Sequence, residues 1–401
     1  MLSIRDTGSD QEFVKLTNRD GRDPFALIAW FLAILGLQVS MLQTSVAEAA
    51  GIERTLPSTT RILFEEGTYA EIGVSYTDPH QRGTGATLPS ALTGFPANID
   101  LDGETSDLFE PYWGFSAALK TDLTDRLSFA LVVDEPYGAD TSYGSDNFGG
   151  AFTYTGTIAE LDARQITGVM AYDLRPDLKL YGGVRALWTE AKADVPFLLD
   201  YKVTTDPEWG AGYLLGVAWS RPELAMRVAL TYASEIKIRY ATEEWETFDS
   251  TTEVRFPQAV DLEFQTGVSP RTLLFGSVRW VEWSAFQMAP KQYTQTFMQP
   301  LVNYEKDFFT YTVGIGRQLT ESLSGSLSFV FEPSQGGSSL NTLGPYDGRR
   351  LGAAALNYEF DRFNLTGGLA YGRLGDTSNG FDTQFDAGRV LSGGLRLGYT
   401  F

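Results

Sequence analysis

The chain has 401 residues, with 31 lysines and arginines against 51 aspartates and glutamates, and its formal net charge is -20. A charge of this sign argues against nucleic acid as a partner, because nucleic-acid binding needs a basic surface. Cysteine is absent and His80 is the only histidine, which excludes disulfides, thiolate chemistry and most imidazole-dependent catalysts. We therefore expect no enzymatic activity, no metal site and no cofactor.

The first predicted element is a secretory signal peptide over residues 1–49. Residues 25–37 form one long apolar run, which is short for a spanning helix, and an A-x-A cleavage site follows at Ala47 and Ala49. Cleavage there would leave Ala50 as the first mature residue, after an unusually long n-region. The alternative is a single N-terminal membrane anchor. In both cases the body of the chain leaves the cytoplasm.

From residue 68 onward, apolar residues recur at every second position in about fourteen segments. This period of two is typical of strands with different surroundings on their two faces. An even number of such strands is required by a single-chain bacterial barrel. The predicted strands are 68–76, 109–120, 126–133, 165–174, 179–192, 210–220, 224–240, 254–264, 271–286, 308–319, 323–331, 350–360, 363–371 and 389–401.

The links between these strands alternate in length. Links of two to five residues, as at 173–177 and 361–362, alternate with long polar links, as at 78–107 and 287–306. A soluble β-sandwich, which is the alternative, has no reason to sort its loops by length. The sequence therefore predicts an all-β transmembrane antiparallel β-barrel with its short turns in the periplasm.

Two adjacent segments also predict where charges lie. In 224–240 the even positions are apolar, and we expect this whole face to meet lipid. The odd positions carry charges that would point inward and pair across the next strand. These predicted inward charges are Glu235, Lys237, Arg239, Arg255, Asp261 and Glu263.

The last strand ends on an aromatic residue. Leu391, Leu395 and Leu397 alternate with polar or small residues, and the chain stops at Phe401. A terminal aromatic of this kind resembles the signal that the barrel-assembly machinery reads in bacterial outer-membrane proteins. We therefore expect Phe401 to act in insertion and closure rather than at a ligand site.

The order of the segments resembles the FadL/TodX (OmpP1) family of outer-membrane transporters for long-chain fatty acids and other hydrophobic compounds. The resemblance is carried by the ordered set 50–52, 135–141, 209–216, 228–238, 256–257, 281–287 and 351–401. It implies a fourteen-stranded barrel over 68–401, plugged by an N-terminal hatch at 50–67. Extracellular loops would catch the ligand and pass it to an internal apolar site.

The resemblance further implies a lateral exit where a strand is kinked, at Glu135, Pro136, Tyr137 and Gly138. Pro136 has no amide hydrogen and Gly138 tolerates unusual dihedral angles, so a ladder can break there. The alternative is an ordinary strand end. The chain departs from the family in a shorter hatch and in shorter links at 194–208 and 241–252, and this puts the substrate in doubt.

Four cations are candidates for binding a ligand carboxylate: Arg185, Lys192, Arg279 and Lys306. A fatty acid needs an apolar slot and one or two cations for its head group. Lys306 is carried over from the family, and Lys192 lies near the position of a family arginine. The alternative is that inward charges pair with one another.

Passive uptake of hydrophobic molecules, most of all long-chain fatty acids, across the outer membrane of a Gram-negative bacterium is the predicted function. A general small-solute porin and an aromatic-hydrocarbon channel of the same family are the alternatives. An outer-membrane lipase would need a placed serine and acid beside His80, which the sequence does not offer. The expected partners are the hydrophobic ligand, membrane lipid and lipopolysaccharide, and the barrel-assembly machinery.

Overall fold

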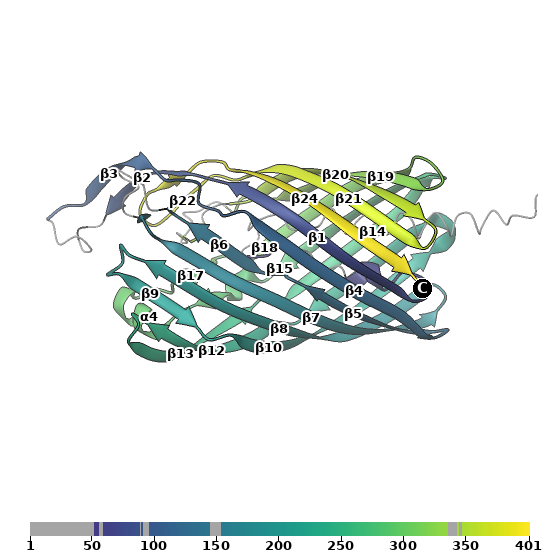
Figure 1. Cartoon of the computed structure of the whole chain (residues 1–401), viewed down its shortest axis with the longest axis horizontal. Helices are drawn as coiled ribbons and strands as arrows, with labels where there is room; N and C mark the ends of the chain where they lie inside the picture. Colours follow the sequence, from purple (N-terminus) through teal and green to yellow (C-terminus); the bar gives the residue numbers. More distant parts are fainter. Residues whose placement is uncertain are drawn as a thin grey trace, which may run out of the picture.

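The computed structural model describes residues 52–55, 59–88, 90, 96–144, 154–335, 343–344 and 347–401. Within them, fourteen strands form one closed antiparallel barrel, and β24 closes it by pairing with β1 (Figure 1). The predicted fold class is confirmed. The wall strands are β1 (Tyr69–His80), β4 (Tyr112–Thr124), β5 (Leu127–Asp134), β7 (Ile158–Arg175), β8 (Leu178–Val195), β10 (Glu208–Arg221), β11 (Met226–Ala233), β14 (Ala259–Ser269), β15 (Thr272–Val281), β18 (Phe308–Gln318), β19 (Leu323–Glu332), β20 (Arg349–Phe360), β21 (Phe363–Leu374) and β24 (Arg389–Thr400).

The connections are sorted by length between the two ends of the barrel. The short turns, including the 3-10 turn η2 (Pro222–Leu224), lie at the end that holds the C-terminus, and the elaborated links lie at the other end (Figure 1). This confirms the predicted sorting of loops. The elaborated links carry β2 (Gly83–Leu88), β3 (Ile99–Glu104), β6 (Gly138–Ser142), β9 (Tyr201–Thr205), β12 (Ile236–Glu244), β13 (Phe248–Phe256), η3 (Trp283–Ala285), β16 (Gln287–Met288), α4 (Lys291–Phe297), β17 (Val302–Asn303), β22 (Thr377–Ser378) and β23 (Gln384–Phe385).

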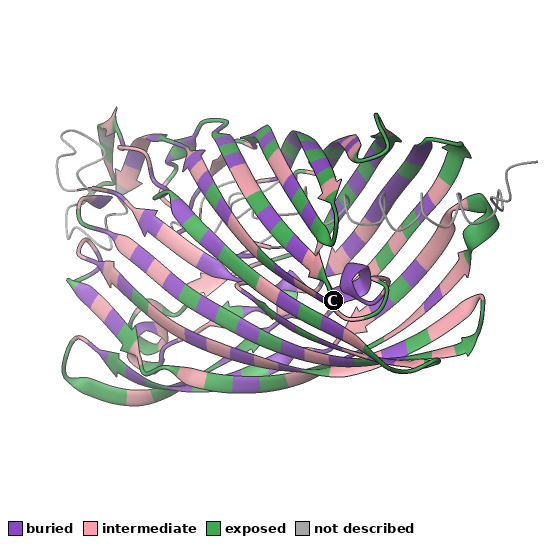
Figure 2. Cartoon of the chain, turned by 45° about the vertical axis from the view of Figure 1, so that its right-hand side comes forward, coloured by how far each residue is buried: buried purple, intermediate pink, exposed green. Residues whose placement is uncertain are grey.

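The wall strands alternate between an apolar outer face and a mixed inner face. On β24, Leu391 and Leu395 are 51% and 56% exposed, whereas Val390 and Arg396 are 0% and 5% exposed. Bands of buried and exposed residues follow one another along the wall strands that face the viewer in Figure 2. Large outward leucines suit a hydrocarbon solvent, and a closed ladder leaves no backbone edge unpaired in it.

The prediction that 224–240 meets lipid along its whole length is wrong. Leu230 on β11 is 45% exposed, but Ile236, Ile238 and Tyr240 on β12 are at most 1% exposed. The face that points inward changes where the strand is interrupted at residues 234–235. The partner strand changes in the same way between β13 and β14, at residues 257–258. The β12–β13 hairpin therefore turns its apolar face to the lumen.

The charges of this hairpin consequently point outward and not inward as predicted. Lys237 Nζ lies 2.9 Å from Glu235 Oε1, and Arg239 Nε lies 2.9 Å from Glu253 Oε2, on the exposed face. Asp261 and Glu263 on β14 do face the interior, where they line a cavity described below. On this hairpin apolar side chains face the lumen and charged side chains face outward, so the polarity of the two faces is exchanged.

The N-terminal segment lies inside the barrel. Its short helix α2 (Thr59–Ile62) is buried, and the Arg61 guanidinium pairs with Glu65 and with Glu71 of β1. Lys120 of β4 donates to the Glu65 carbonyl at 2.7 Å. Residues 1–49, the predicted signal peptide, and 50–51 and 56–58 of the predicted hatch lie outside the described residues. Among the described helices, none has the length and hydropathy needed to cross a membrane.

Candidate functional site

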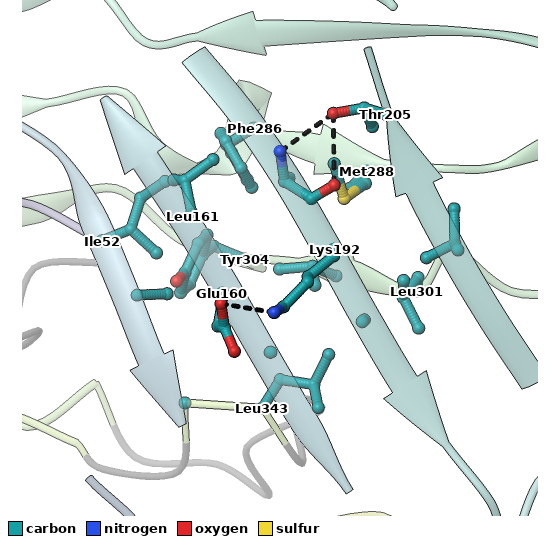
Figure 3. A pocket seen from close by; sticks show the side chains of 17 residues that line it. Ile52, Glu160, Leu161, Lys192, Thr205, Phe286, Met288, Leu301, Tyr304 and Leu343 are labelled. Carbon is teal, nitrogen blue, oxygen red and sulfur yellow. Dashed lines mark hydrogen bonds and ion pairs between the residues drawn. The ribbon is translucent and has the colours of Figure 1, made fainter. Parts of the chain in front are cut away.

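An apolar pocket lies in the half of the barrel that carries the long loops. It encloses about 690 Å³ of empty space, part of it open to solvent, between β6, β7, β8 and β9 and the link from β15 to β18. Figure 3 shows Leu161, Met288 and Leu301 pointing into it. Its wall is made of small and aliphatic side chains, among them Ala139, Ala159, Leu161, Ala191, Val203 and Leu301.

The pocket wall carries one ion pair. Among its described lining residues, Lys192 is the one cation and Glu160 the one acid. Lys192 Nζ lies 2.8 Å from Glu160 Oε2, and both side chains are roughly half exposed, at 49% and 43% (Figure 3). The charge of Lys192 is therefore balanced within the protein before any ligand arrives.

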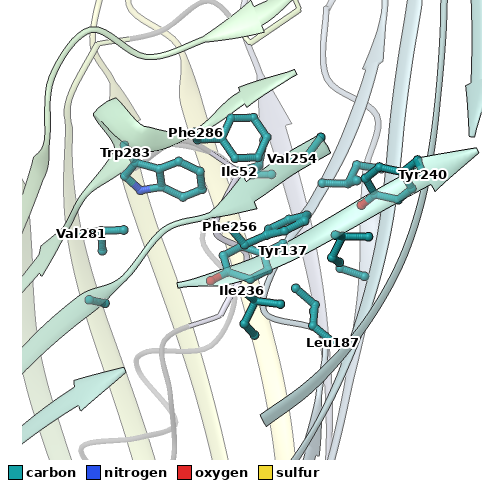
Figure 4. Packing of buried hydrophobic residues seen from close by; sticks show 14 residues of the cluster. Ile52, Tyr137, Leu187, Ile236, Tyr240, Val254, Phe256, Val281, Trp283 and Phe286 are labelled. Atoms are coloured by element: carbon teal, nitrogen blue, oxygen red, sulfur yellow. The ribbon is translucent and has the colours of Figure 1, made fainter. Parts of the chain in front are cut away.

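An aromatic and aliphatic cluster closes the floor of this pocket. Trp283 and Phe286 pack with ring centroids 5.5 Å apart, and Phe256 lies 5.8 Å from Phe286. Ile52 and Phe286 belong both to this cluster and to the pocket wall, and Figure 4 shows them side by side above Tyr137. The N-terminal segment thus contributes to the floor directly.

The wall of the barrel is interrupted beside this floor. β5 ends at Asp134 and β6 begins at Gly138, and β6 pairs with β7 but not with β4. The β4–β5 ladder stops at Ala117 and Val133, so residues 112–116 of β4 lose their neighbour on that side. The Glu135 carboxylate accepts a hydrogen bond from the Phe115 amide at 3.1 Å and so replaces one ladder bond.

The N-terminal segment covers the interruption from inside. The Arg54 amide donates to the Pro136 carbonyl at 2.9 Å, and the Gly138 amide donates to the Ile52 carbonyl at 3.0 Å. The Arg54 guanidinium pairs with Asp140 and lies 4.1 Å from the centre of the Tyr112 ring. A Cβ atom at Gly138 would lie 2.3 Å from this guanidinium, so glycine permits the close approach.

A second, polar chamber is lined in part by Glu53, Thr55, Thr59 and Thr60 of the N-terminal segment. It holds about 590 Å³, part of it open to solvent. Arg279 donates to Glu53 at 2.6 Å and to Asp261 at 2.5 Å, and all three side chains are largely buried. Arg185 donates to the Gln165 side chain at 3.0 and 3.2 Å and to the Ser234 carbonyl at 3.1 Å.

The structure separates the four predicted head-group cations. Arg185 and Arg279 come together on the polar chamber, and Lys192 lines the apolar pocket. Lys306 lines neither cavity, and its Nζ donates to the Gln335 carbonyl at 2.5 Å. Among the predicted kink residues, Pro136 and Tyr137 line the polar chamber, while Glu135 reaches outward to β4.

Several lining residues were missed from the sequence. Met288, Leu301 and Val302 lie in the link 287–306, for which the sequence predicts a polar loop. The apolar residues of this link indicate that part of it is buried. Glu53, the partner of Arg279, had no such signal because the two residues are 226 positions apart.

A closed barrel with an apolar outer face, an internal apolar pocket and an interrupted wall defines an outer-membrane transporter for hydrophobic compounds. The family model described as outer membrane protein transport protein (OMPP1/FadL/TodX) matches residues 60–371. The chain belongs to this family, whose members are outer-membrane proteins of Gram-negative bacteria. No curated protein sequence matches the chain.

Solved structures show the same fold at low sequence identity. A FadL homologue of Pseudomonas aeruginosa is 13% identical, with a TM-score of 0.68 over 90% of this chain and 97% of that one. The toluene transporter TodX of Pseudomonas putida is 12% identical, with a TM-score of 0.61 over 90% and 99%. The toluene transporter TbuX of Ralstonia pickettii is 11% identical, with a TM-score of 0.57 over 90% and 99%.

Proposed function

We propose that this protein carries small neutral hydrophobic molecules, of the size of a one-ring aromatic hydrocarbon, passively across the outer membrane. The observation that supports this is the apolar pocket, whose one cation is already paired with Glu160. A neutral apolar molecule gains free energy by leaving water for such a wall and breaks no ion pair on entry.

The proposed route leads from the long loops into the pocket and then to the interruption at 135–138. Ile52 and Ala139 line the pocket and flank this interruption, so the two are neighbours. The ligand would leave sideways once residues 52–54 release Pro136 and Gly138. Exit into the membrane keeps a hydrophobic molecule out of water, and no energy source is needed because transfer runs down its gradient.

Long-chain fatty acids are the second candidate. Lys192 supports them, since it is about half exposed on the pocket wall and could turn from Glu160 to a ligand carboxylate. Arg185 and Arg279 would have to give up buried partners to do the same, which is costly.

The test is uptake of labelled toluene and labelled oleate into proteoliposomes. Ala191→Phe fills the pocket and should lower toluene uptake about tenfold, because overpacking leaves no room for the ring. Ala353→Phe is the matched control, since Ala353 also faces the lumen but lies on β20, away from both cavities. Equal uptake by both variants would refute the proposal. Large ion conductance by the wild type in planar bilayers would favour the porin alternative.

We infer that Phe401 serves assembly and not transport. Its amide donates to the Thr68 carbonyl at 2.9 Å, and its ring, 67% exposed, contacts Tyr399 on the outer face. Deleting Phe401 should lower the amount of folded barrel and leave its substrate profile unchanged.

A further inference from the structure

Consecutive residues of the N-terminal segment line the two cavities. Ile52 lines the apolar pocket, and Glu53 lines the polar chamber and forms a β-bridge with Tyr137. A molecule that moves from the pocket toward the interrupted wall must pass this segment. Pro136 and Tyr137 of the interruption also line the chamber, so such a molecule can enter the chamber on this route.

The two guanidinium groups of the chamber already bind protein partners. Nε and both terminal nitrogens of Arg279 go to Glu53 and Asp261, and those of Arg185 go to Gln165 and Ser234. A ligand that carries an acceptor would have to compete with these buried pairs. A ligand carboxylate that enters the chamber would therefore find both guanidinium groups already bound to protein partners.

One acceptor of the chamber is unused. Asp134, the last residue of β5, is 8% exposed and lines the chamber, and its Oδ1 has no hydrogen-bond partner among the described residues. A buried carboxylate oxygen without a donor is costly, so a donor from outside the protein would stabilise it. Asp134 stands directly before the kink at residues 135–137.

We propose that the polar chamber binds hydrophobic molecules that carry a neutral hydroxyl group, such as alkylphenols, and that Asp134 accepts a hydrogen bond from this hydroxyl. This rests on the proposed function, since it assigns the substrate class of the same route. Leu214, Ala233 and Pro136 supply apolar surface for the rest of the molecule.

The charges of the chamber also favour a neutral ligand with a hydroxyl group. Four carboxylates line it, from Glu53, Asp134, Asp261 and Glu263, against the two guanidinium groups of Arg185 and Arg279. An anionic ligand adds a like charge to this set and is repelled. A pure hydrocarbon leaves Oδ1 of Asp134 without a donor. A neutral hydroxyl avoids both costs.

The test compares three ligands of nearly equal shape, toluene, p-cresol and p-toluate, in equilibrium binding to the purified barrel. Asp134→Leu removes the acceptor, Asp134→Asn keeps one oxygen in place, and Asp125→Leu in a periplasmic turn is the matched control. For each ligand, the affinity for the variant is compared with its affinity for the wild type. The partition of the ligand into detergent is the same in both measurements and therefore cancels. We expect Asp134→Leu to weaken p-cresol about tenfold and to leave toluene within about twofold, because one charge-assisted hydrogen bond is lost.

The outcomes separate the two proposals. If Asp134→Leu weakens p-cresol and toluene equally, or neither, or if Asp134→Asn loses p-cresol as fully as Asp134→Leu, the hydroxyl site is refuted and the chamber holds water only. If p-toluate binds the wild type more tightly than p-cresol, the site is also refuted. Failure of toluene to bind, with p-cresol still sensitive to Asp134→Leu, refutes the proposed function and leaves the hydroxyl site standing.

Discussion

The two halves of the barrel wall are built differently. From β15 through β24 to β4 every strand is continuous, whereas the part from β5 to β14 is interrupted at 135–137, 206–207, 234–235 and 257–258. Apart from Arg279 on β15 and the loop residues, the residues that line the two cavities come from the interrupted part and the N-terminal segment. Both halves carry exposed apolar side chains on their outer face, but only the interrupted half forms the candidate transport route.

An interruption is tolerated only where other groups replace the lost ladder bonds, because unpaired amides are costly near lipid. At the interruption 135–137, the Glu135 carboxylate accepts a hydrogen bond from the Phe115 amide. The backbone of the N-terminal segment forms hydrogen bonds with Pro136 and Gly138. At the interruption 234–235, the Ser234 hydroxyl accepts a hydrogen bond from the Tyr213 amide at 2.9 Å. The following variants test this division, each with a control in the continuous half or on the outer face.

The largest effect is expected from Arg279→Gln. It leaves Glu53 and Asp261 buried without their cation, and the loss of one partner from a buried ion network costs about 3 kcal/mol. Denaturant unfolding followed by tryptophan fluorescence measures this. The control, Arg239→Gln, breaks an exposed pair with Glu253 and should cost less than about 1 kcal/mol. Equal losses would contradict a central role for Arg279.

Gly138→Val should displace the Arg54 side chain from Asp140 and Tyr112. The new side chain would overlap the Arg54 guanidinium, so the cover over the interruption loosens and ion leakage through the barrel rises several-fold. Single-channel recording detects the leak. Gly352→Val on β20 is the control, because a Cβ atom there meets nothing within 4 Å. Unchanged ion conductance of the Gly138→Val barrel would show that the Arg54 side chain does not help to seal the wall.

Ser234→Ala should cost about 1 kcal/mol, the usual value of one buried hydrogen bond, since the Tyr213 amide loses its acceptor. Ser326→Ala on β19 is the counterpart in the continuous half. Ser326 is 5% exposed and its hydroxyl has no partner among the described residues, so its loss should be close to neutral. If both variants unfold alike, the hydroxyl does not replace a ladder bond.

The smallest effect is expected from Lys192→Gln. It breaks a half-exposed ion pair, so toluene uptake should change by less than about twofold. Oleate uptake is the informative comparison, because a fall with Lys192→Gln and a rise with Glu160→Gln would support fatty acids as substrates. No change in oleate uptake with either variant would favour neutral ligands.

The sequence predicted the wall strands of both halves, but it did not predict the change of face in the interrupted half. A period of two locates a strand, but it does not say which face meets lipid. Ile236 and Ile238 continue the apolar rhythm of Leu230, yet they point to the lumen because the strand is interrupted at 234–235. The alternation itself does not reveal the inversion, since β12 and β13 are still apolar on one face and charged on the other.

The cavities depend on contacts between distant segments. Arg185 and Arg279 could be placed inside the barrel from their strands, but Glu53 and Ser234, which bind them, could not be predicted from spacing. Pro136 and Gly138 marked the kink, whereas the Arg54 contact that depends on Gly138 needed the fold. The roles of the four cations and of the kink in transport stay predictions.

The central claim is that the apolar pocket is where a hydrophobic substrate is held. The most direct measurement is the anomalous scattering of crystals soaked with 4-bromotoluene. A bromine peak is expected between Ala191, Met288 and Leu301, inside the apolar pocket. Bromine only on the lipid-facing surface, in a protein that still takes up toluene, would contradict it.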